Sequence, residues 1–156
     1  MDFGDHLRMT GSALKNWVIA QVLDSFAAGL LWAVGLYALQ VRLAWLWALL
    51  AAMFQIIPHL GPVLALIGPV VATAIWWRDW EHLIGVLILY VLIALVDGFL
   101  LQPYIMRRTA KVPIWASILA PIVLGILWPF WGVLLALPLL AVVYAYKQHY
   151  QKSSNP

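Results

Sequence analysis

Apolar residues fill six long runs of the chain, and short polar or proline-containing segments separate these runs. The runs cover residues 17–39, 44–57, 63–77, 83–96, 114–127 and 132–145. Each run is long enough for a helix, and the first exceeds the roughly 20 residues that cross the hydrocarbon core of a bilayer. The pattern therefore predicts an all-α membrane protein, a polytopic bundle of about six hydrophobic helical segments.

The last three runs are short for a membrane crossing. Each has about fourteen residues, which gives roughly 21 Å of helix against a hydrocarbon core of about 30 Å. Flanking residues could extend each helix to the full thickness. Alternatively, some pairs of runs form re-entrant hairpins, and the segment 114–145 around Pro129 is the main candidate. Both alternatives stay open.

Polar positions divide the chain into three parts. Residues 1–16 form a polar tail or a short interfacial helix, residues 17–146 form the transmembrane helical domain, and residues 147–156 form a polar cytoplasmic tail. The apolar run after Lys15 is too long for the core of a signal peptide and lacks a cleavage site of small residues. We therefore expect this first helix to be retained.

Composition supports a membrane protein and excludes several other classes. The chain is 65% hydrophobic and only 10% charged, with a mean hydropathy of +0.95, whereas roughly 25% of residues are charged in an ordinary soluble domain. The absence of cysteine excludes disulfides and a thiolate metal site. No basic stripe suits nucleic acid. The expected partners are the lipid bilayer and either further copies of the chain or another membrane subunit.

Charge and tryptophan predict the same orientation. Suppose that all six runs cross the membrane and that the N-terminus is cytoplasmic. The cytoplasmic side then receives seven basic residues, and the opposite side receives two, Arg42 and Arg78. The positive-inside rule therefore favours cytoplasmic N- and C-termini. The seven are Arg8, Lys15, Arg107, Arg108, Lys111, Lys147 and Lys152. Seven tryptophans, which prefer the membrane interface, fall on the opposite side. These are Trp45, Trp47, Trp76, Trp77, Trp80, Trp128 and Trp131.

Asp24 is an ionisable residue inside the first apolar run. Helical spacing places it on one face with Gln21 and Ser25. An ionisable group within a span suggests proton or cation handling. The structural alternative is a carboxylate near the headgroups, capped by Ser25 or paired with Lys15.

Asp97 follows fourteen apolar residues and is followed by Gly98 and by Gln102-Pro103. A helix that weakens here would expose backbone carbonyls, a carboxylate and an amide to one cavity, which is the composition of a cation or proton site. The alternative is an ion pair with Arg107 or Arg108 at the membrane edge.

His59 is a candidate because histidine can change its charge near neutral pH, but it stands alone in a turn, where a hydrogen-bonded structural role is the alternative. No second histidine or carboxylate stands at ligand spacing, so the sequence predicts no metal. It also contains no catalytic or phosphate-binding motif, and we expect neither an enzyme nor a cofactor.

Glycine and proline interrupt the apolar pattern at three places and mark candidate hinges or helix breaks. These residues are Pro58, Gly61, Pro62, Gly68, Pro69, Gly98 and Pro103. Proline removes a backbone donor and bends a helix. The pairs Gly61-Pro62 and Gly68-Pro69 are compatible both with a kinked, tightly packed span and with a hinge or unwound segment that lines a path.

Three segments together resemble the autoinducer-2 exporter family of bacterial membrane permeases. Residues 57–62 (Ile-Pro-His-Leu-Gly-Pro) resemble its Ile-Pro-x-hydrophobic-Gly-Pro segment. Residues 97–106 resemble its acidic-small-x-x-x-Gln-Pro-x-Ile segment, with Pro113 where the family has a later proline. Residues 132–141 resemble its closing Gly-x-x-x-Ala-hydrophobic-Pro helix. Pro129 departs from the family, which usually has glycine there.

The resemblance covers the C-terminal half of a typical member and implies an oligomeric transporter of the bacterial inner membrane. Family members are linked to export of a small signalling molecule or to sodium/proton exchange. We therefore expect a transporter or permease whose transport path or coupling site uses Asp97, Gln102, Asp24 and His59. The alternative is a non-transporting structural subunit of a larger membrane complex.

Overall fold

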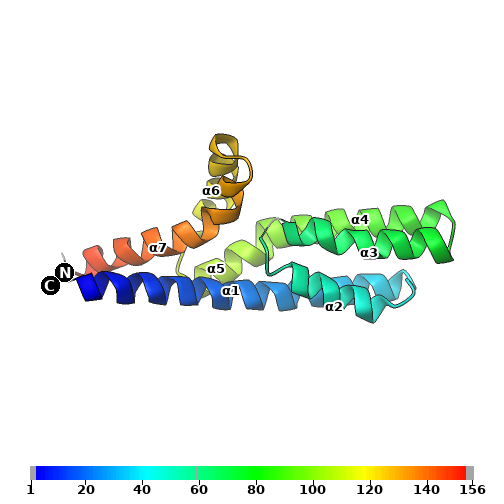
Figure 1. The fold of residues 1–156 in the computed structure, drawn as a ribbon, viewed down its shortest axis with the longest axis horizontal. Coiled ribbons are helices and arrows are strands. Elements are labelled where there is room, and N and C mark those ends of the chain that lie inside the picture. The colour runs from blue at the N-terminus through cyan, green and yellow to red at the C-terminus, as the bar shows by residue number, and fades with distance from the viewer. Residues whose placement is uncertain (1–2, 59, 154–156) are drawn as a thin grey trace. The chain divides into compact units, whose positions relative to one another are not determined.

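The structure, a computed structural model, describes residues 3–58 and 60–153, and helices make up most of these residues (Figure 1). In chain order they are α1 (Phe3–Ala38), α2 (Ala44–Phe54), α3 (Leu60–Trp76), α4 (Trp80–Val96), the π-helix η1 (Asp97–Leu101), α5 (Gln102–Thr109), α6 (Ile114–Leu127) and α7 (Trp131–Ser153). The described ranges contain no strand. The prediction of an all-α fold is confirmed.

Three helical segments in the described ranges are long and apolar enough to cross a membrane, namely Phe3–Ala38, Trp80–Thr109 and Trp131–Gln151. The apolar helices α2, α3 and α6 are shorter. This pattern is that of a multi-pass membrane protein, as the sequence predicted. Because α6 has only 14 residues, the choice between a full crossing and a re-entrant hairpin for residues 114–145 stays a prediction.

The chain folds as two compact units, which we describe separately. The central unit comprises residues 21–101, and the terminal unit comprises residues 1–20 together with residues 102–156. The helices α1 and α4–η1–α5 each continue along the chain from one unit into the other.

Small residues allow close helix packing in the central unit. Ala44, Ala48 and Ala51 are buried along one side of α2. A Cβ atom added at Gly29 of α1 would lie 2.6 Å from the Cβ of Ala52, so the two helices approach each other closely. In lipid, where apolar side chains gain little by leaving the solvent, such close packing of small residues holds helices together.

One end of the central unit is rich in tryptophan. Here α2 begins, α3 ends and α4 begins, and the guanidinium of Arg42 lies 5.3 Å from the centre of the Trp76 ring. Trp45, Trp76 and Trp80 are all exposed. The α2–α3 turn lies at the opposite end of the α2 and α3 helices, so the central unit has one aromatic end and one end that carries Gln55.

The terminal unit joins the beginning of α1 to the end of α7. The Tyr146 hydroxyl lies 3.1 Å from Nδ1 of His6 and 3.2 Å from the Thr10 hydroxyl, and the Tyr146 and His6 rings stack. Residues 3–16 are helical and belong to the same helix as the apolar run that follows. Residues 3–16 are therefore helical, and an interfacial position of this helix stays a prediction.

Among the described residues other than glycine, four have left-handed backbone conformations, with φ between 52° and 59°. They are Gln40, Leu43, Arg78 and Lys111, and all lie in or beside connections between helices. For a residue with a Cβ this conformation costs roughly 1–2 kcal/mol. These connections are therefore tight turns in which residues with a side chain occupy a backbone conformation that favours glycine.

Asp79 caps the N-terminus of α4, and its carboxylate accepts a hydrogen bond of 3.0 Å from the backbone N–H of His82. This bond holds the pKa of Asp79 below its ordinary value of 3.8, because it stabilises the charged form. The cap therefore stabilises the first turn of α4 above this pH and is lost as the pH falls through the lower, folded-state pKa.

We expect amide hydrogen exchange at His82 to lose protection as the pH falls below 3.8, because a protonated Asp79 is a weaker acceptor. Protection at Val86, one turn further into α4, provides the internal reference. Asp79→Ala should remove the protection already at neutral pH, whereas Asp79→Asn should retain part of it and abolish the pH dependence. Equal protection in all three proteins would contradict the capping role.

Candidate functional site

Five polar side chains are buried together in the central unit, and we call them the buried polar cluster. Gln21, Asp24 and Ser25 come from α1, Gln55 follows α2, and Asp97 begins η1. Each is at most 5% exposed. Burial of this kind away from water is costly for a polar group and more so for a charged one, so the cluster requires an explanation beyond packing.

Local helix geometry positions the cluster residues. Gln21, Asp24 and Ser25 share one face of α1, as their spacing predicted, and this face is buried whereas Val22 and Leu23 are exposed. Gln55 caps the C-terminus of α2. Asp97 lies where α4 widens into the π-helix, so the expected weakening after Asp97 takes this form and the helix does not end there.

The π-helix has a local cause. Pro103 has no N–H to donate to the carbonyl four residues earlier, and its ring collides with that carbonyl in regular α geometry. A wider turn immediately before the proline relieves this collision. Turns of this kind are frequent at functional sites.

Amide and hydroxyl donors link the cluster through hydrogen bonds. The Gln21 amide donates to the Gln55 carbonyl at 2.7 Å, and the Gln55 side-chain amide donates to Oδ2 of Asp97 at 2.6 Å. The Ser25 hydroxyl donates to the Gln21 carbonyl at 2.8 Å. Gln55 therefore connects α1 to η1 through its backbone and its side chain.

Three carboxylate oxygens of the cluster have no hydrogen-bond donor among the described residues. They are both oxygens of Asp24 and Oδ1 of Asp97. The two carboxyl groups are close enough to interact directly with each other. Neither carboxylate forms an ion pair with a lysine or arginine that the structure describes. Two adjacent carboxylates away from water are compatible with one shared proton or one bound cation.

The structure brings together Asp24 and Asp97 but not every predicted site residue. Gln102 is buried and belongs to the terminal unit, so its shared cavity with Asp97 stays a prediction. His59 lies outside the described residues. Gln55 was missing from the predicted site, although it is the single polar residue of the apolar run 44–57. This isolation in an apolar run is the sequence signal that could have identified it.

The glycine and proline positions are mostly packed inside helices. Gly61 and Pro62 lie in the first turn of α3, and α3 remains helical through Gly68 and Pro69. A Cβ atom at Gly68 would overlap the Trp47 ring. An unwound segment at Gly68-Pro69 is therefore not seen, and the arrangement is that of a packed span. A hinge role for these residues stays a prediction.

The remaining predicted break positions are distributed between the two units. Pro58 is buried in the turn before α3, and Gly98 is exposed within η1. Pro103 is buried in the first turn of α5, directly after the π-helix that we attribute to it.

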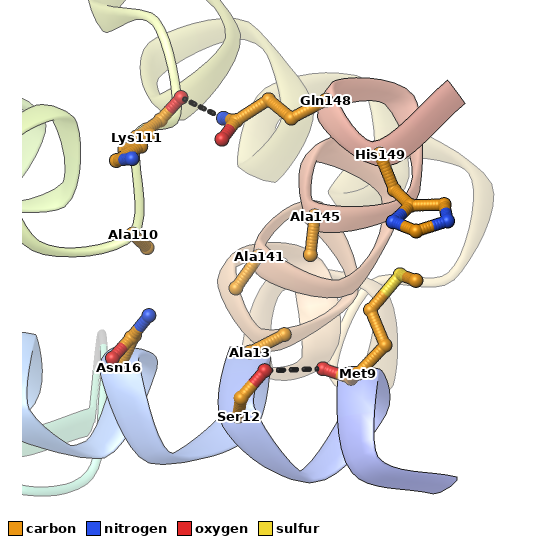
Figure 2. A pocket seen from close by; sticks show the side chains of 10 residues that line it. All are labelled: Met9, Ser12, Ala13, Asn16, Ala110, Lys111, Ala141, Ala145, Gln148 and His149. Carbon is orange, nitrogen blue, oxygen red and sulfur yellow. Dashed lines mark hydrogen bonds between the residues drawn. The ribbon is translucent and has the colours of Figure 1, made fainter. Parts of the chain in front are cut away.

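The terminal unit contains a polar cavity of about 260 Å³, separate from the buried polar cluster (Figure 2). Residues from the start of α1, the α5–α6 connection and the end of α7 line it, and small alanines form part of its wall. Figure 2 shows the Gln148 side-chain amide reaching the backbone carbonyl of Lys111, at 3.3 Å. This contact fixes the α5–α6 connection against α7.

No metal site is evident in the described part of the chain, where no three histidine, aspartate or glutamate side chains gather. The central unit thus contains two buried carboxylates, one of which accepts a hydrogen bond from the Gln55 amide, in a helical bundle with an apolar exterior. Such a bundle is typical of a polytopic membrane protein that handles protons, cations or polar solutes.

Comparison with known proteins identifies the family. Residues 2–152 match the family described as AI-2E family transporter, and the chain belongs to this family. The resemblance in the three sequence segments is thereby confirmed. No solved structure matches the chain significantly.

Curated relatives carry transport names. The chain is 36% identical to AI-2 transport protein TqsA of Escherichia coli (strain K12) over 132 residues, which are 84% of this chain and 38% of TqsA. It is 28% identical to a putative transport protein of Thermotoga maritima, over 89% of this chain and 43% of the relative. It is 26% identical to the putative transport protein YhhT of Escherichia coli (strain K12), over 89% of this chain and 39% of the relative. The matches therefore span about two-fifths of the length of these relatives.

Proposed function

We propose that the chain works in a transporter of the bacterial inner membrane that moves a small solute or ion, without being an enzyme. The buried polar cluster, with three carboxylate oxygens that lack donors, is the observation that carries this proposal. The family supports it, and the relative TqsA, an AI-2 transport protein, makes AI-2 one candidate solute. Cation/proton exchange is the second candidate, because paired carboxylates bind either species.

In the proposed mechanism, Asp24 and Asp97 together hold one proton or one monovalent cation. Gln55 fixes Asp97 from one side through the 2.6 Å hydrogen bond and leaves its Oδ1 available. Loss of the bound ion leaves two negative charges side by side at low dielectric, which is unfavourable. Rearrangement of the helices that carry the cluster would then separate the carboxylates or expose them to water, and this coupling drives transport.

Flux through reconstituted vesicles tests the proposal. The purified chain should move protons in response to a sodium gradient, detected with a trapped pH-sensitive dye, or should accelerate uptake of a labelled small solute when a pH gradient is imposed. Empty vesicles are the control. If no imposed ion gradient produces proton or solute flux above this control, the chain is a non-transporting subunit of a larger membrane complex, which is the alternative function.

We also propose that both termini are cytoplasmic. Basic residues near the ends of the chain and exposed tryptophans around the α3–α4 turn support this orientation. Since the chain has no cysteine, single introduced cysteines can be labelled without background. In spheroplasts, a membrane-impermeant maleimide should label Glu81→Cys directly and Tyr150→Cys only after permeabilisation. The reverse pattern would overturn the orientation.

Association with further copies of the chain is part of the proposal. Large apolar side chains are exposed along every long helix, for example Val34, Leu92 and Leu139. Lipid alone can cover this surface, and a homo-oligomer or another membrane subunit can cover part of it. Native mass spectrometry of the purified chain should give a defined multimer. A monomer that nevertheless transports in vesicles would remove the oligomer from the mechanism.

A further inference from the structure

A basic groove lies in the terminal unit, where α5 ends, α6 begins and the end of α7 passes. Arg107, Lys111 and Lys147 supply its three cations, and the groove has a volume of about 440 Å³. Val112 and Tyr144 are among the residues that form its wall. The groove is separate from the buried polar cluster and plays no part in the proposed coupling.

The positive charge of this groove is not neutralised by the chain around it. The sequence from Gln102 to Pro156 contains five lysines and arginines and neither aspartate nor glutamate. In the part of the chain that the structure describes, none of the three groove cations forms an ion pair. The groove is therefore complementary to an anion.

The groove is also held in shape. Val112 is fully buried and its N–H donates to the Met106 carbonyl at 3.3 Å, which fixes the α5–α6 connection from one side. The Gln148 amide fixes it from the other side through the Lys111 carbonyl (Figure 2). The Lys147 ammonium lies 5.5 Å from the centre of the Tyr144 ring. A ligand would find these groups already positioned, so binding requires little ordering of the backbone.

The surroundings of the groove match the headgroup level of a membrane. The apolar helix α6 starts directly after Pro113, and Trp115 in its first turn is 62% exposed. The apolar part of α7 ends at Ala145, just before Lys147. Exposed aromatic rings beside basic residues at the ends of apolar helices are typical of the membrane–water interface. An anion bound here would lie beside exposed apolar surface that suits acyl chains.

We propose that the basic groove binds the phosphate headgroup of an anionic phospholipid, with the acyl chains along the exposed apolar side of α6. The charge selects an anion, and the adjoining apolar surface distinguishes a phospholipid from soluble phosphate. Basic pockets between membrane helices are suited to such headgroups. The bound lipid would bridge α5, α6 and α7 at the level of the headgroups.

Native mass spectrometry of the purified 156-residue chain tests this proposal. In detergent micelles doped with equal amounts of phosphatidylglycerol and phosphatidylcholine, the adducts should be mostly phosphatidylglycerol. The variant Arg107→Gln/Lys147→Gln should weaken phosphatidylglycerol binding by more than about fivefold, since each interfacial cation contributes about that factor. Phosphatidylcholine binding should not change.

A charge-matched control removes two cations elsewhere. Arg42→Gln/Arg78→Gln in the central unit should leave phosphatidylglycerol binding unchanged. Arg107→Lys/Lys147→Arg, which keeps both positive charges of the groove, should retain phosphatidylglycerol binding. An equal loss in both double-glutamine variants, or no preference for phosphatidylglycerol in the unaltered chain, would overturn the site.

Inorganic phosphate, added without lipid, should not bind measurably at millimolar concentration. If it binds in the groove and phosphatidylglycerol does not displace it, the ligand is soluble phosphate and the lipid assignment is wrong.

Discussion

Asp24→Asn is expected to lower ion-coupled flux by about tenfold to a hundredfold, because it removes a charged ligand whose interactions are each worth roughly 1.5–3 kcal/mol. The asparagine side chain has nearly the same shape, so the packing of α1 is retained. Asp97→Asn should act similarly, since the two carboxyl groups form one site. Flux is measured in vesicles with a trapped pH-sensitive dye.

A stability measurement distinguishes this role in ion coupling from a purely structural role of the two carboxylates. If the two carboxylates serve transport at the expense of stability, Asp24→Asn should raise the thermal unfolding midpoint in detergent while it lowers flux, because burying a carboxylate without a hydrogen-bond donor is unfavourable. Asp79→Asn, which changes an exposed carboxylate at the α3–α4 turn, should alter neither flux nor midpoint appreciably. Unchanged flux in both Asp24→Asn and Asp97→Asn would remove the cluster from the coupling mechanism.

Gly61→Ala is expected to destabilise the central unit by about 2–3 kcal/mol, as for overpacking of a well-packed interior. A Cβ atom here would lie 2.5 Å from the Phe54 carbonyl oxygen and 2.6 Å from the Cα of Gln55. Both are backbone atoms that can move only if the α2–α3 turn changes. Because Gln55 donates to Asp97, the same change should disturb the buried polar cluster.

Gly11→Ala is the matched control for this prediction. Gly11 is also helical but, unlike the buried Gly61, it is exposed, and an added Cβ would have no atom within 4 Å. Alanine is a better helix former than glycine by roughly 1 kcal/mol, so this variant should be as stable as the unaltered chain or slightly more stable. Unfolding in mixed detergent micelles, followed by circular dichroism, measures both. Equal midpoints for the two variants would show that the α2–α3 turn tolerates a side chain.

The helices of this fold can be predicted well from the sequence, because the length of each apolar run is enough to indicate a helix. Each of the six runs is helical in the structure. The start of α1 at Phe3 was not predictable in this way. The polar residues before Lys15 belong to this helix and contact Tyr146 near the other end of the chain, and local pattern carries no information about such a distant contact.

The candidate site was predicted in part. Asp24 and Asp97 were selected separately because each is an ionisable group in an apolar run, but their pairing is tertiary and no sequence spacing reveals it. Gln55, which links Gln21 and Asp97 at the α2–α3 turn, was not predicted because an amide carries no charge and is less costly than a carboxylate in an apolar run. The sequence predicted a weakened helix after Asp97, and the structure has a π-helix there. In a π-helix the backbone carbonyls accept hydrogen bonds from donors five residues later, so the helix continues.

The left-handed backbone at Lys111 sets stability and ligand binding against each other. Its φ of 56° suits glycine better than lysine. Lys111→Gly would therefore relax this connection while it removes one of the three cations of the basic groove. A chain optimised only for folding would carry glycine here, so the lysine is a compromise between an easily formed turn and a charge held at the membrane surface.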